Sequence, residues 1–380
     1  MQLFVAFTAI DPSLGRVSKD CLSTQTLLEL FISKLHDDDQ EIFKSAAGDF
    51  LPYDEWDGIA TDKDDTSKLN INITLAFQNA GELSFEWVPP SVRKLIILRC
   101  PLRSLLRNLD QLPHGMVDFV LCGDELQGSV DLTRFPESLR TLDISRNEFV
   151  GLVDLATLPT HLKSLDISRN QFKGTVNFSK LPSSVANVSL YDNKFCGSLH
   201  TETLPQSLRS LNLAKNQFHG SLDLATLPPN MECLYLYDNA FSGSVDLRRL
   251  PRQFEALYSF SNKFTGGLSL DSLPTTMVLI DLSENMLSGP LDLLHLPNDL
   301  RTLSLEKNAF TGSLRIDPIP IKMSELFLHA NQFEGDIVIG RIPADLDRIS
   351  VDTRRGQNVY WTDGSLCTDA RVEKDDITVG

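Results

Sequence analysis

The chain has 380 residues, and its 42% hydrophobic and 23% charged content is that of a folded protein, which excludes wholesale disorder and a small disulfide-stapled domain. The 51 acidic residues outnumber the 35 Lys and Arg, which gives a formal net charge of −16. Because nucleic acids and acidic lipid surfaces bind basic footprints, we expect no nucleic-acid partner.

The N-terminal segment and the cysteines bear on the compartment. Residues 1–10 form an apolar run, but it lacks a basic flank, and Asp11 and Pro12 follow where a cleavage site needs small residues. No window of 18 uninterrupted apolar residues occurs, so we expect no membrane span. The six cysteines are scattered without a C-x-x-C pair, as is typical of thiols in a reducing compartment. We therefore expect a cytoplasmic or otherwise intracellular protein, with secretion or surface display as the alternative.

We expect residues 1–88 to form an acidic N-terminal cap followed by a first irregular repeat. Apolar positions between residues 24 and 46 have helical spacing and are interrupted by three aspartates at residues 37–39, which predicts two short helices. An array of repeats needs such a cap, because its terminal turn would otherwise expose an apolar face.

A 23-residue repeat dominates the rest of the chain. Asn recurs with this period nine times, at Asn147, Asn170, Asn193, Asn216, Asn239, Asn262, Asn285, Asn308 and Asn331. Pro and Gly keep the same period, so each unit is one turn of a solenoid.

Each repeated position has a physical role. The L-x-L step alternates apolar and polar residues, as in a strand with one buried face, and stacked turns then form a parallel sheet about 4.8 Å per step. The Asn that follows each strand can bond backbone groups of neighbouring turns with its amide, which predicts a continuous ladder of the nine asparagines. A Phe stands two positions after the ladder Asn in most turns, which predicts a spine of stacked rings, and Leu287 replaces the Phe in one turn.

One unit, residues 159–178, reads PTHLKSLDISRNQFKGTVNF. This pattern resembles the leucine-rich repeat, with an N-x-F-x-G step similar to the plant-type subclass and a 23-residue form similar to kinetoplastid repeats. The resemblance covers residues 89–354. It implies an α/β-type repeat solenoid that is mostly β, namely a horseshoe of about twelve strands with a parallel concave sheet, a short or irregular convex side and a helical N-terminal cap. It also implies a role in protein recognition.

The ends of the array depart from the family. Trp56-Asp-Gly-Ile resembles the W-x-G-V segment of plant-type caps, but Asp54 and Thr61 stand where that cap has disulfide cysteines. This departure favours an intracellular protein. At the other end, Asp363-Gly364 lies between apolar residues and predicts a hairpin, so we expect residues 355–380 to form a C-terminal cap and tail.

No motif for phosphate binding, zinc binding or nucleophilic catalysis occurs in the chain. We therefore expect no enzymatic activity, no cofactor and no metal site.

Function is expected at the outward positions of each strand, which the repeat leaves unconstrained. At the positions four and two before the ladder Asn, the predicted partner-binding residues are Tyr191, Asn212, Tyr235, Tyr237, Tyr258, Phe260, Asp281, Glu306, Phe327 and His329. Four of the six tyrosines lie in this set. Tyr is favoured at binding hot spots because it buries area and keeps a polar tip.

Acidic residues lie on both sides of these aromatics, with Asp143 and Asp166 before them and Asp281, Glu284 and Glu306 after them. We therefore expect a monomeric scaffold that binds a protein or peptide with an apolar anchor and flanking basic residues. Two alternatives stay open. The rings could serve only to stabilise the sheet, by about 0.2–1 kcal/mol per pair. The protein could also be a structural subunit that docks through its caps or convex side.

Overall fold

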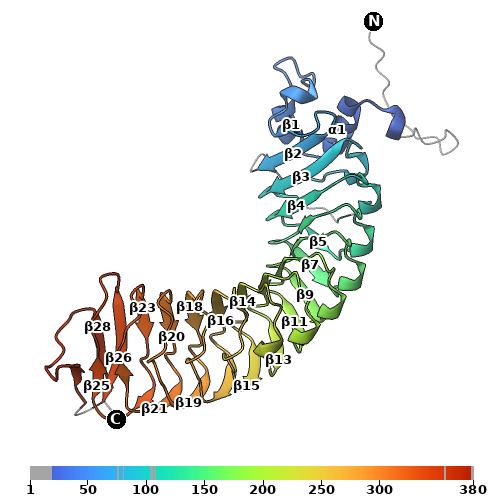
Figure 1. Ribbon diagram of the computed structural model, residues 1–380. Helices are drawn as coiled ribbons and strands as arrows, with labels where there is room; N and C mark the ends of the chain where they lie inside the picture. The colour runs from blue at the N-terminus through green and yellow to red at the C-terminus, as the bar shows by residue number, and fades with distance from the viewer. Residues whose placement is uncertain are drawn as a thin grey trace, which may run out of the picture.

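The chain winds into a curved solenoid whose successive turns place their strands side by side (Figure 1). The computed structural model describes residues 19–377 except 75–76, 80, 103–105, 107 and 355–356. The N-terminal apolar run at residues 1–10 lies outside the described residues. Within the described part of the chain, no helix is long and apolar enough to cross a bilayer.

The main sheet has fifteen strands and lines the inner side of the curve. In order these are β1 (Ile59–Thr61), β2 (Leu69–Thr74), β3 (Val92–Leu98), β4 (Asp118–Cys122), β6 (Thr141–Asp143), β8 (Ser164–Asp166), β10 (Asn187–Ser189), β12 (Ser210–Asn212), β14 (Cys233–Tyr235), β16 (Ala256–Tyr258), β18 (Leu279–Asp281), β20 (Thr302–Ser304), β23 (Glu325–Phe327), β26 (Arg348–Arg354) and β28 (Val372–Ile377). Only β1 pairs antiparallel, with β2. Residues 23 apart are partners, for example Leu165 with Val188 and Val188 with Leu211.

The outer side is built from shorter elements. A ten-stranded sheet contains β5 (Gln127–Gly128), β7 (Glu148–Gly151), β9 (Gln171–Thr175), β11 (Lys194–Gly197), β13 (Gln217–Gly220), β15 (Ala240–Gly243), β17 (Lys263–Gly266), β19 (Met286–Pro290), β21 (Ala309–Gly312) and β24 (Gln332–Phe333). A three-stranded sheet of β22 (Arg315–Ile316), β25 (Ile337–Ile339) and β27 (Val359–Trp361) follows near the C-terminus. This confirms the predicted parallel-strand solenoid with a short, irregular convex side.

Single 3₁₀ turns lie between the sheets in the first half of the array: η5 (Leu109–Gln111), η6 (Leu132–Arg134), η7 (Leu155–Thr157), η8 (Phe178–Lys180), η9 (Thr201–Thr203) and η10 (Leu224–Thr226). The Asp of the L-D-L step caps several of them, as where Asp154 accepts a hydrogen bond from the Ala156 N–H at 3.0 Å. This acceptor satisfies an N–H that would lack a partner at the start of the turn. The recurrence of Asp in this step is therefore structural.

The asparagine side chains form the predicted ladder. In the turn of Asn170, the side-chain oxygen accepts a hydrogen bond from the Phe149 N–H at 3.0 Å. The amide group donates to the carbonyls of Ile144, Ile167 and Ser168 at 3.0–3.2 Å. The same bonds recur from Asn147 to Asn331, so each amide joins its own strand end to the preceding turn. The residue before each Asn has a positive φ, for example 51° at Arg169, and the ladder holds this otherwise unfavourable conformation in place.

The phenylalanines stack beneath the ladder, as predicted. Phe149 and Phe172 have centroids 6.2 Å apart, and Phe218 and Phe241 are also 6.2 Å apart with an interplanar angle of 6°. All four rings are almost fully buried between the two sheets. The spine and the leucines of the L-x-L steps form one continuous hydrophobic core that runs the length of the solenoid.

The N-terminal cap contains two short helices, α1 (Thr24–Ile32) and α2 (Asp37–Gln40), along with η1 (Lys19–Cys21), η2 (Glu41–Phe43), η3 (Tyr53–Glu55) and η4 (Phe85–Trp87). The three aspartates at residues 37–39 occupy the first turn of α2. Negative side chains stabilise a helix there, because the helix dipole is positive at its N-terminus. The aspartates begin the second helix rather than lying between the two. The buried Asp39 also accepts hydrogen bonds from the N–H groups of Gln78 and Asn79.

At the C-terminal end, the main sheet continues beyond residue 354. Strand β28 pairs in parallel with β26, so residues 372–377 add another strand to the array. Tyr360 and Leu366 form an antiparallel bridge around the Asp363-Gly364 turn. The same segment joins the three-stranded sheet through β27.

Asp124 occupies a ladder position in place of Asn. Its side chain is fully buried, and one carboxyl oxygen accepts a hydrogen bond from the Cys100 N–H at 2.8 Å. The other oxygen, among the described residues, has no hydrogen-bond partner. In the regular turns the corresponding atom is the side-chain nitrogen of Asn, which donates hydrogen bonds to backbone carbonyls. Burial, and to a lesser extent the charge of Asp143, raises the pKa of Asp124 to about 7.

Replacing a ladder residue, Asn193→Ala, should lower the free energy of unfolding by about 2–4 kcal/mol, because it leaves the buried Phe172 N–H without its acceptor and removes a donor from the Ile167 carbonyl. Urea unfolding followed by circular dichroism measures the change. The exposed Gln217→Ala serves as the control, with an expected change below about 0.5 kcal/mol. Equal effects of the two substitutions would show that the ladder does not stabilise the fold.

Asp124→Asn should make stability less dependent on pH. The pKa of Asp124 is raised on folding, so the folded state is favoured most below about pH 4. This stability is lost as pH rises towards 7, at a cost of about 4 kcal/mol. Thermal unfolding at pH 4.5 and pH 8 should therefore show a gain for the variant that is larger at pH 8. An equal gain at both pH values would mean that the carboxyl is already ionised in the folded protein at the lower pH.

Candidate functional site

Five aromatic side chains gather on the concave sheet and define what we call the aromatic plate: Tyr191, Tyr235, Tyr237, Tyr258 and Phe260. Each is partly exposed. Tyr235 and Tyr258 are register partners on β14 and β16, and their rings stack with centroids 4.9 Å apart and an interplanar angle of 10°. Tyr237 stacks on Phe260 in the same way at 4.5 Å and 8°. These four rings thus form a two-by-two arrangement on adjacent turns.

Tyr191 contacts the other rings of the plate across one intervening turn. Its ring centroid lies 6.1 Å from that of Tyr237, although Ala214 occupies the turn between them. Ala214 is fully buried, so its small side chain forms a floor over which the two larger rings meet. Asn212 belongs to the same floor, and its side-chain oxygen accepts a hydrogen bond from the Ala214 N–H at 3.1 Å.

Two cations flank Tyr191. The Arg169 guanidinium and the Lys215 ammonium lie 5.4 and 5.7 Å from its ring centroid, within cation–π range. Burial alone would raise the pKa of Tyr191, but hydrogen bonding to Lys215 and Arg169 holds that pKa below its usual value. Burial raises the pKa of Tyr235 and of Tyr237 to about 12, so both keep their hydroxyl protons at neutral pH.

Two half-buried carboxyl groups lie on the other side of the plate. Asp281 is the register partner of Tyr258, and burial raises its pKa. Glu306 follows one turn later, and its pKa is raised by burial and by the charge of Asp281. One carboxyl oxygen of Glu306 is buried and has no hydrogen-bond partner among the described residues. Nearby, Glu284 is already neutralised by an ion pair with Lys307.

The remaining predicted site residues lie further along the sheet. The Phe327 ring sits under the Arg348 guanidinium at 6.0 Å, and His329 shares a hydrogen bond of 3.1 Å with the Ser350 hydroxyl. Neither has a ring contact with the plate in the described structure. They form a separate group two turns beyond Asp281.

The position four before the ladder Asn has a structural role that the sequence interpretation missed. Side-chain oxygens of Asp143, Asp166, Asn212 and Asp281 each accept a hydrogen bond from the N–H two residues later, at 2.9–3.1 Å. Asp and Asn favour this local bond, so their recurrence alone could have indicated it. The carboxyls of Asp143 and Asp166 are therefore part of the strand bend, and the exposed groups beside them are Arg146 and Arg169.

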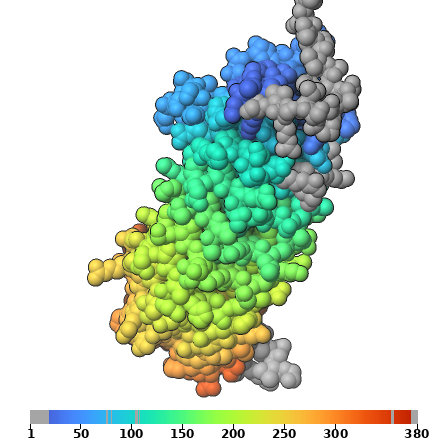
Figure 2. Space-filling model, turned by 90° about the vertical axis from the view of Figure 1, so that its right-hand side faces the viewer, coloured from blue at the N-terminus to red at the C-terminus, as the bar shows by residue number. Residues whose placement is uncertain are grey.

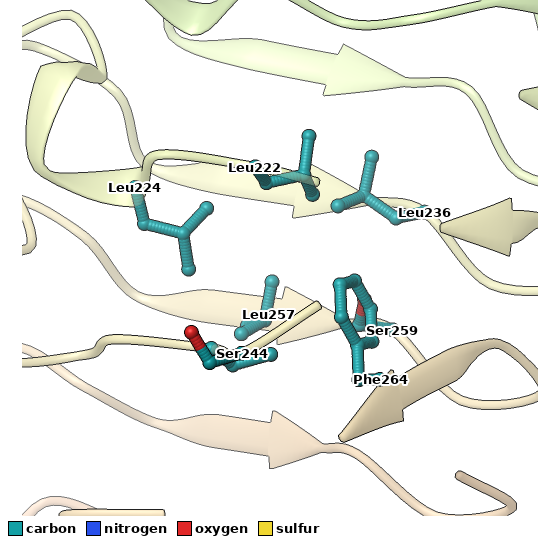
Figure 3. Close-up of a pocket in the computed structure, with 8 residues that line it drawn as sticks. Leu222, Leu224, Leu236, Ser244, Leu257, Ser259 and Phe264 are labelled. Carbon is teal, nitrogen blue, oxygen red and sulfur yellow. The ribbon is translucent and has the colours of Figure 1, made fainter. Parts of the chain in front are cut away.

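A small cavity lies in the core behind the plate (Figure 3). Its volume is about 10 Å³, close to that of one water, and Leu236, Leu257 and Phe264 are among its lining residues. Ser259 also lines it, and its buried hydroxyl has no hydrogen-bond partner among the described residues. In the equivalent position the other eight regular turns have Leu or Ile. The cavity is therefore a packing defect beneath Tyr258 and Phe260 and is too small for an organic ligand.

Among the residues that the structure describes, the outer face has no stacked pair of partly exposed aromatic rings like those of the plate. Figure 2 views the molecule from the right-hand side of Figure 1, where the outer surfaces of the turns in the N-terminal half follow one another continuously. The outward residues of β9, β11 and β13 there include Lys173, Lys194 and Gln217, which are all exposed. The concave face is thus the candidate binding surface.

Comparisons with known proteins agree with this architecture. Residues 159–175 match a family model described as Leucine Rich repeat, and the repeat unit of this chain is a leucine-rich repeat. No curated protein gives a significant match to the chain.

Several solved structures share the fold. A plant ice-binding protein is 21% identical, with a TM-score of 0.57 over 70% of this chain and 88% of its own. The Arabidopsis receptor kinase HAESA, in complex with the peptide hormone IDA and the co-receptor SERK1, is 21% identical, with a TM-score of 0.56 over 88% of this chain and 64% of its own. The ectodomain of the membrane receptor kinase GASSHO1/SCHENGEN3 from Arabidopsis thaliana, in complex with CASPARIAN STRIP INTEGRITY FACTOR 2, is 17% identical, with a TM-score of 0.54 over 93% of this chain and 47% of its own. The chain therefore spans about half to two thirds of the receptor chains it resembles.

These neighbours contradict the expectation of a cytoplasmic or otherwise intracellular protein, because they include receptor ectodomains. The expectation relied on the N-terminal segment, on the scattered cysteines and on the missing cap cysteines around Trp56. The Trp56 ring packs on Phe43 with centroids 4.6 Å apart, and its indole N–H donates to the Leu51 carbonyl. Packing and hydrogen bonding thus hold this cap segment in place, so the missing cysteines do not indicate a compartment.

Ser259→Leu should raise the free energy of unfolding by about 1–2 kcal/mol, because it fills the cavity and removes a buried hydroxyl that has no partner. Chemical denaturation measures the gain, and the smaller Ser259→Val should give an intermediate value. A loss of stability in both variants would show that the surrounding leucines have already closed the space.

Proposed function

We propose that this protein is a non-enzymatic recognition protein, secreted or displayed at a cell surface, that binds a peptide or an extended protein segment on its concave face. The observation that carries the proposal is the aromatic plate. Four tyrosines and one phenylalanine stay partly exposed on a face whose other outward positions are mostly small or polar. Two structures of the same fold support a role of this kind: a receptor ectodomain in complex with CASPARIAN STRIP INTEGRITY FACTOR 2, and a receptor kinase in complex with the peptide hormone IDA.

The plate has the properties of a binding hot spot. Its paired rings are held parallel by the sheet, so a ligand would lose little free energy in ordering them. Tyr235, Tyr237 and Tyr258 keep hydroxyl donors along an apolar surface, and Tyr is enriched at hot spots for this combination. An apolar or aromatic side chain of the partner would pack on the rings.

The carboxyl groups beside the plate select the flanking residues of that partner. Asp281 and Glu306 have no ion-pair partner among the described residues, and the buried oxygen of Glu306 has no hydrogen-bond donor. A Lys or Arg of the partner would supply the opposite charge. Glu284 contributes less, because Lys307 already neutralises it.

Peptide selection tests this proposal. A phage-displayed random peptide library is panned on the immobilised wild-type protein, and the enriched peptides are measured by isothermal titration calorimetry. Replacing Tyr235, Tyr237 and Tyr258 together by Ala should weaken their binding at least about 30-fold, because hot-spot residues are each worth about 2 kcal/mol or more.

The matched control replaces three outward residues of the convex face, Lys173, Gln217 and Lys263, by Ala. This variant should bind the enriched peptides as the wild type does. If the peptides bind the tyrosine variant with unchanged affinity while both variants keep the wild-type circular dichroism spectrum, the concave site is wrong, and the rings serve only to stabilise the sheet.

A further inference from the structure

The concave face carries opposite charges on its two halves. The charge of each turn is counted from the residue before its strand to the residue before its ladder Asn. The four turns that end at Asn147, Asn170, Asn193 and Asn216 hold six cations and three anions: Arg140, Arg146, Lys163, Arg169, Arg209 and Lys215 against Asp143, Asp166 and Asp192. The next four turns hold two cations and six anions: Arg301 and Lys307 against Glu232, Asp238, Glu255, Asp281, Glu284 and Glu306. In a chain of net charge −16, the basic half is a local exception.

Few of these charges are neutralised within the face. Arg209 pairs with Glu232 across the boundary of the two halves, and Lys307 pairs with Glu284 inside the acidic half. Among the described residues, Arg146, Arg169 and Lys215 have no ion pair, and all three are exposed. Two of them converge on Tyr191, so the basic half and the plate share a side chain.

The plate lies where the charge changes sign. Tyr191 belongs to the basic half, whereas Tyr235, Tyr237, Tyr258 and Phe260 belong to the acidic half beside Asp281. A ligand centred on the rings therefore meets cations towards the N-terminal turns and carboxylates towards the C-terminal turns.

We infer that the occupant of this face is an extended dipolar peptide segment, with acidic residues on one side of an apolar centre and basic residues on the other, lying along the solenoid axis. The inference rests on the proposed function and deepens it by setting the charge pattern of the ligand. Charge complementarity fixes the placement: the acidic part lies over Arg169 and Lys215, and the basic part lies over Asp281 and Glu306.

The spacing of the turns sets the length of the segment. Arg169 and Asp281 stand five turns apart, which is about 24 Å at about 4.8 Å per turn. An extended chain covers this span in about seven residues at about 3.3 Å each. The acidic and basic groups of the ligand should therefore be separated by about seven positions.

Three fluorescein-labelled synthetic peptides with one apolar centre test the inference by fluorescence anisotropy. The dipolar peptide is Glu-Glu-Ser-Ser-Leu-Trp-Ser-Ser-Arg-Arg. The basic and acidic peptides have Arg or Glu at both ends. The dipolar peptide should bind at least about tenfold more tightly than either of the others, with an affinity that falls as salt is raised.

Charge-reversed variants locate the acidic end of the bound peptide. Arg169→Glu with Lys215→Glu should weaken the dipolar peptide at least about tenfold and should make the basic peptide the preferred ligand. The milder pair Arg169→Gln and Lys215→Gln should change affinity in the same direction if the reversed pair fails to fold. The control, Lys173→Glu with Lys194→Glu, makes the same change of charge on the convex face and should leave all three affinities unchanged.

The outcomes separate this inference from the proposal on which it rests. If the basic peptide binds the wild type most tightly and the tyrosine triple variant loses it, the charge pattern is wrong while the concave site stands. If no peptide binds the wild type better than the tyrosine variant, both are overturned. Equal loss of the dipolar peptide in the concave and convex charge variants would also overturn the charge pattern, because only net charge would then matter.

Discussion

The buried asparagine amide is the interaction on which the rest of this structure depends. At each strand end the chain must pass through a residue of positive φ, and the amide of the next residue satisfies the backbone groups that this bend would leave unpaired. Each amide also accepts the N–H of the phenylalanine or leucine at the equivalent position of the preceding turn. The bend, the aromatic spine and the step between turns are therefore set by one side chain, repeated nine times.

This constraint decides where variation is possible. Within a turn, the inward leucines, the ladder Asn and the Phe are fully committed to packing and hydrogen bonding. The residue before the strand, the outward residues of the strand and the residue of positive φ have more freedom, although an Asp or Asn four positions before the ladder Asn also closes the strand bend. The aromatic plate and the two charged halves consist of such residues, and the register of the sheet brings members of different turns side by side, as with Tyr235, Tyr258 and Asp281. The proposed binding surface and the stabilising core thus use mostly different positions of the same repeat.

Much of this arrangement could be predicted from the sequence because the repeat is a periodic signal. The ladder, the spine and the stacked rings of the plate follow from a period of 23 and the alternation of a strand. Single departures from the repeat were harder to interpret. The effect of Ser259 depends on whether neighbouring leucines fill its space, and the pKa of Asp124 depends on which atoms face its second oxygen. Neither is a property of spacing.

Where the sequence interpretation failed, a residue type had two physical uses. The two predicted cap helices are present, but the aspartates at residues 37–39, taken as the break between them, form the first turn of the second helix. Asp143 and Asp166 carry charge, yet they also close the strand bend by a local hydrogen bond. The missing cap cysteines suggested a reducing compartment, yet the packing of Trp56 on Phe43 makes a disulfide unnecessary.

Hydrogen–deuterium exchange read at single residues tests the central claim most directly. The N–H groups of Phe149, Phe172 and Phe195 donate to side-chain oxygens of the next turn. The ladder predicts that these amides exchange as slowly as the strand amides of Leu165 and Leu211. Exchange as fast as that of exposed loop amides would contradict it, because the asparagines would then not hold the turns together.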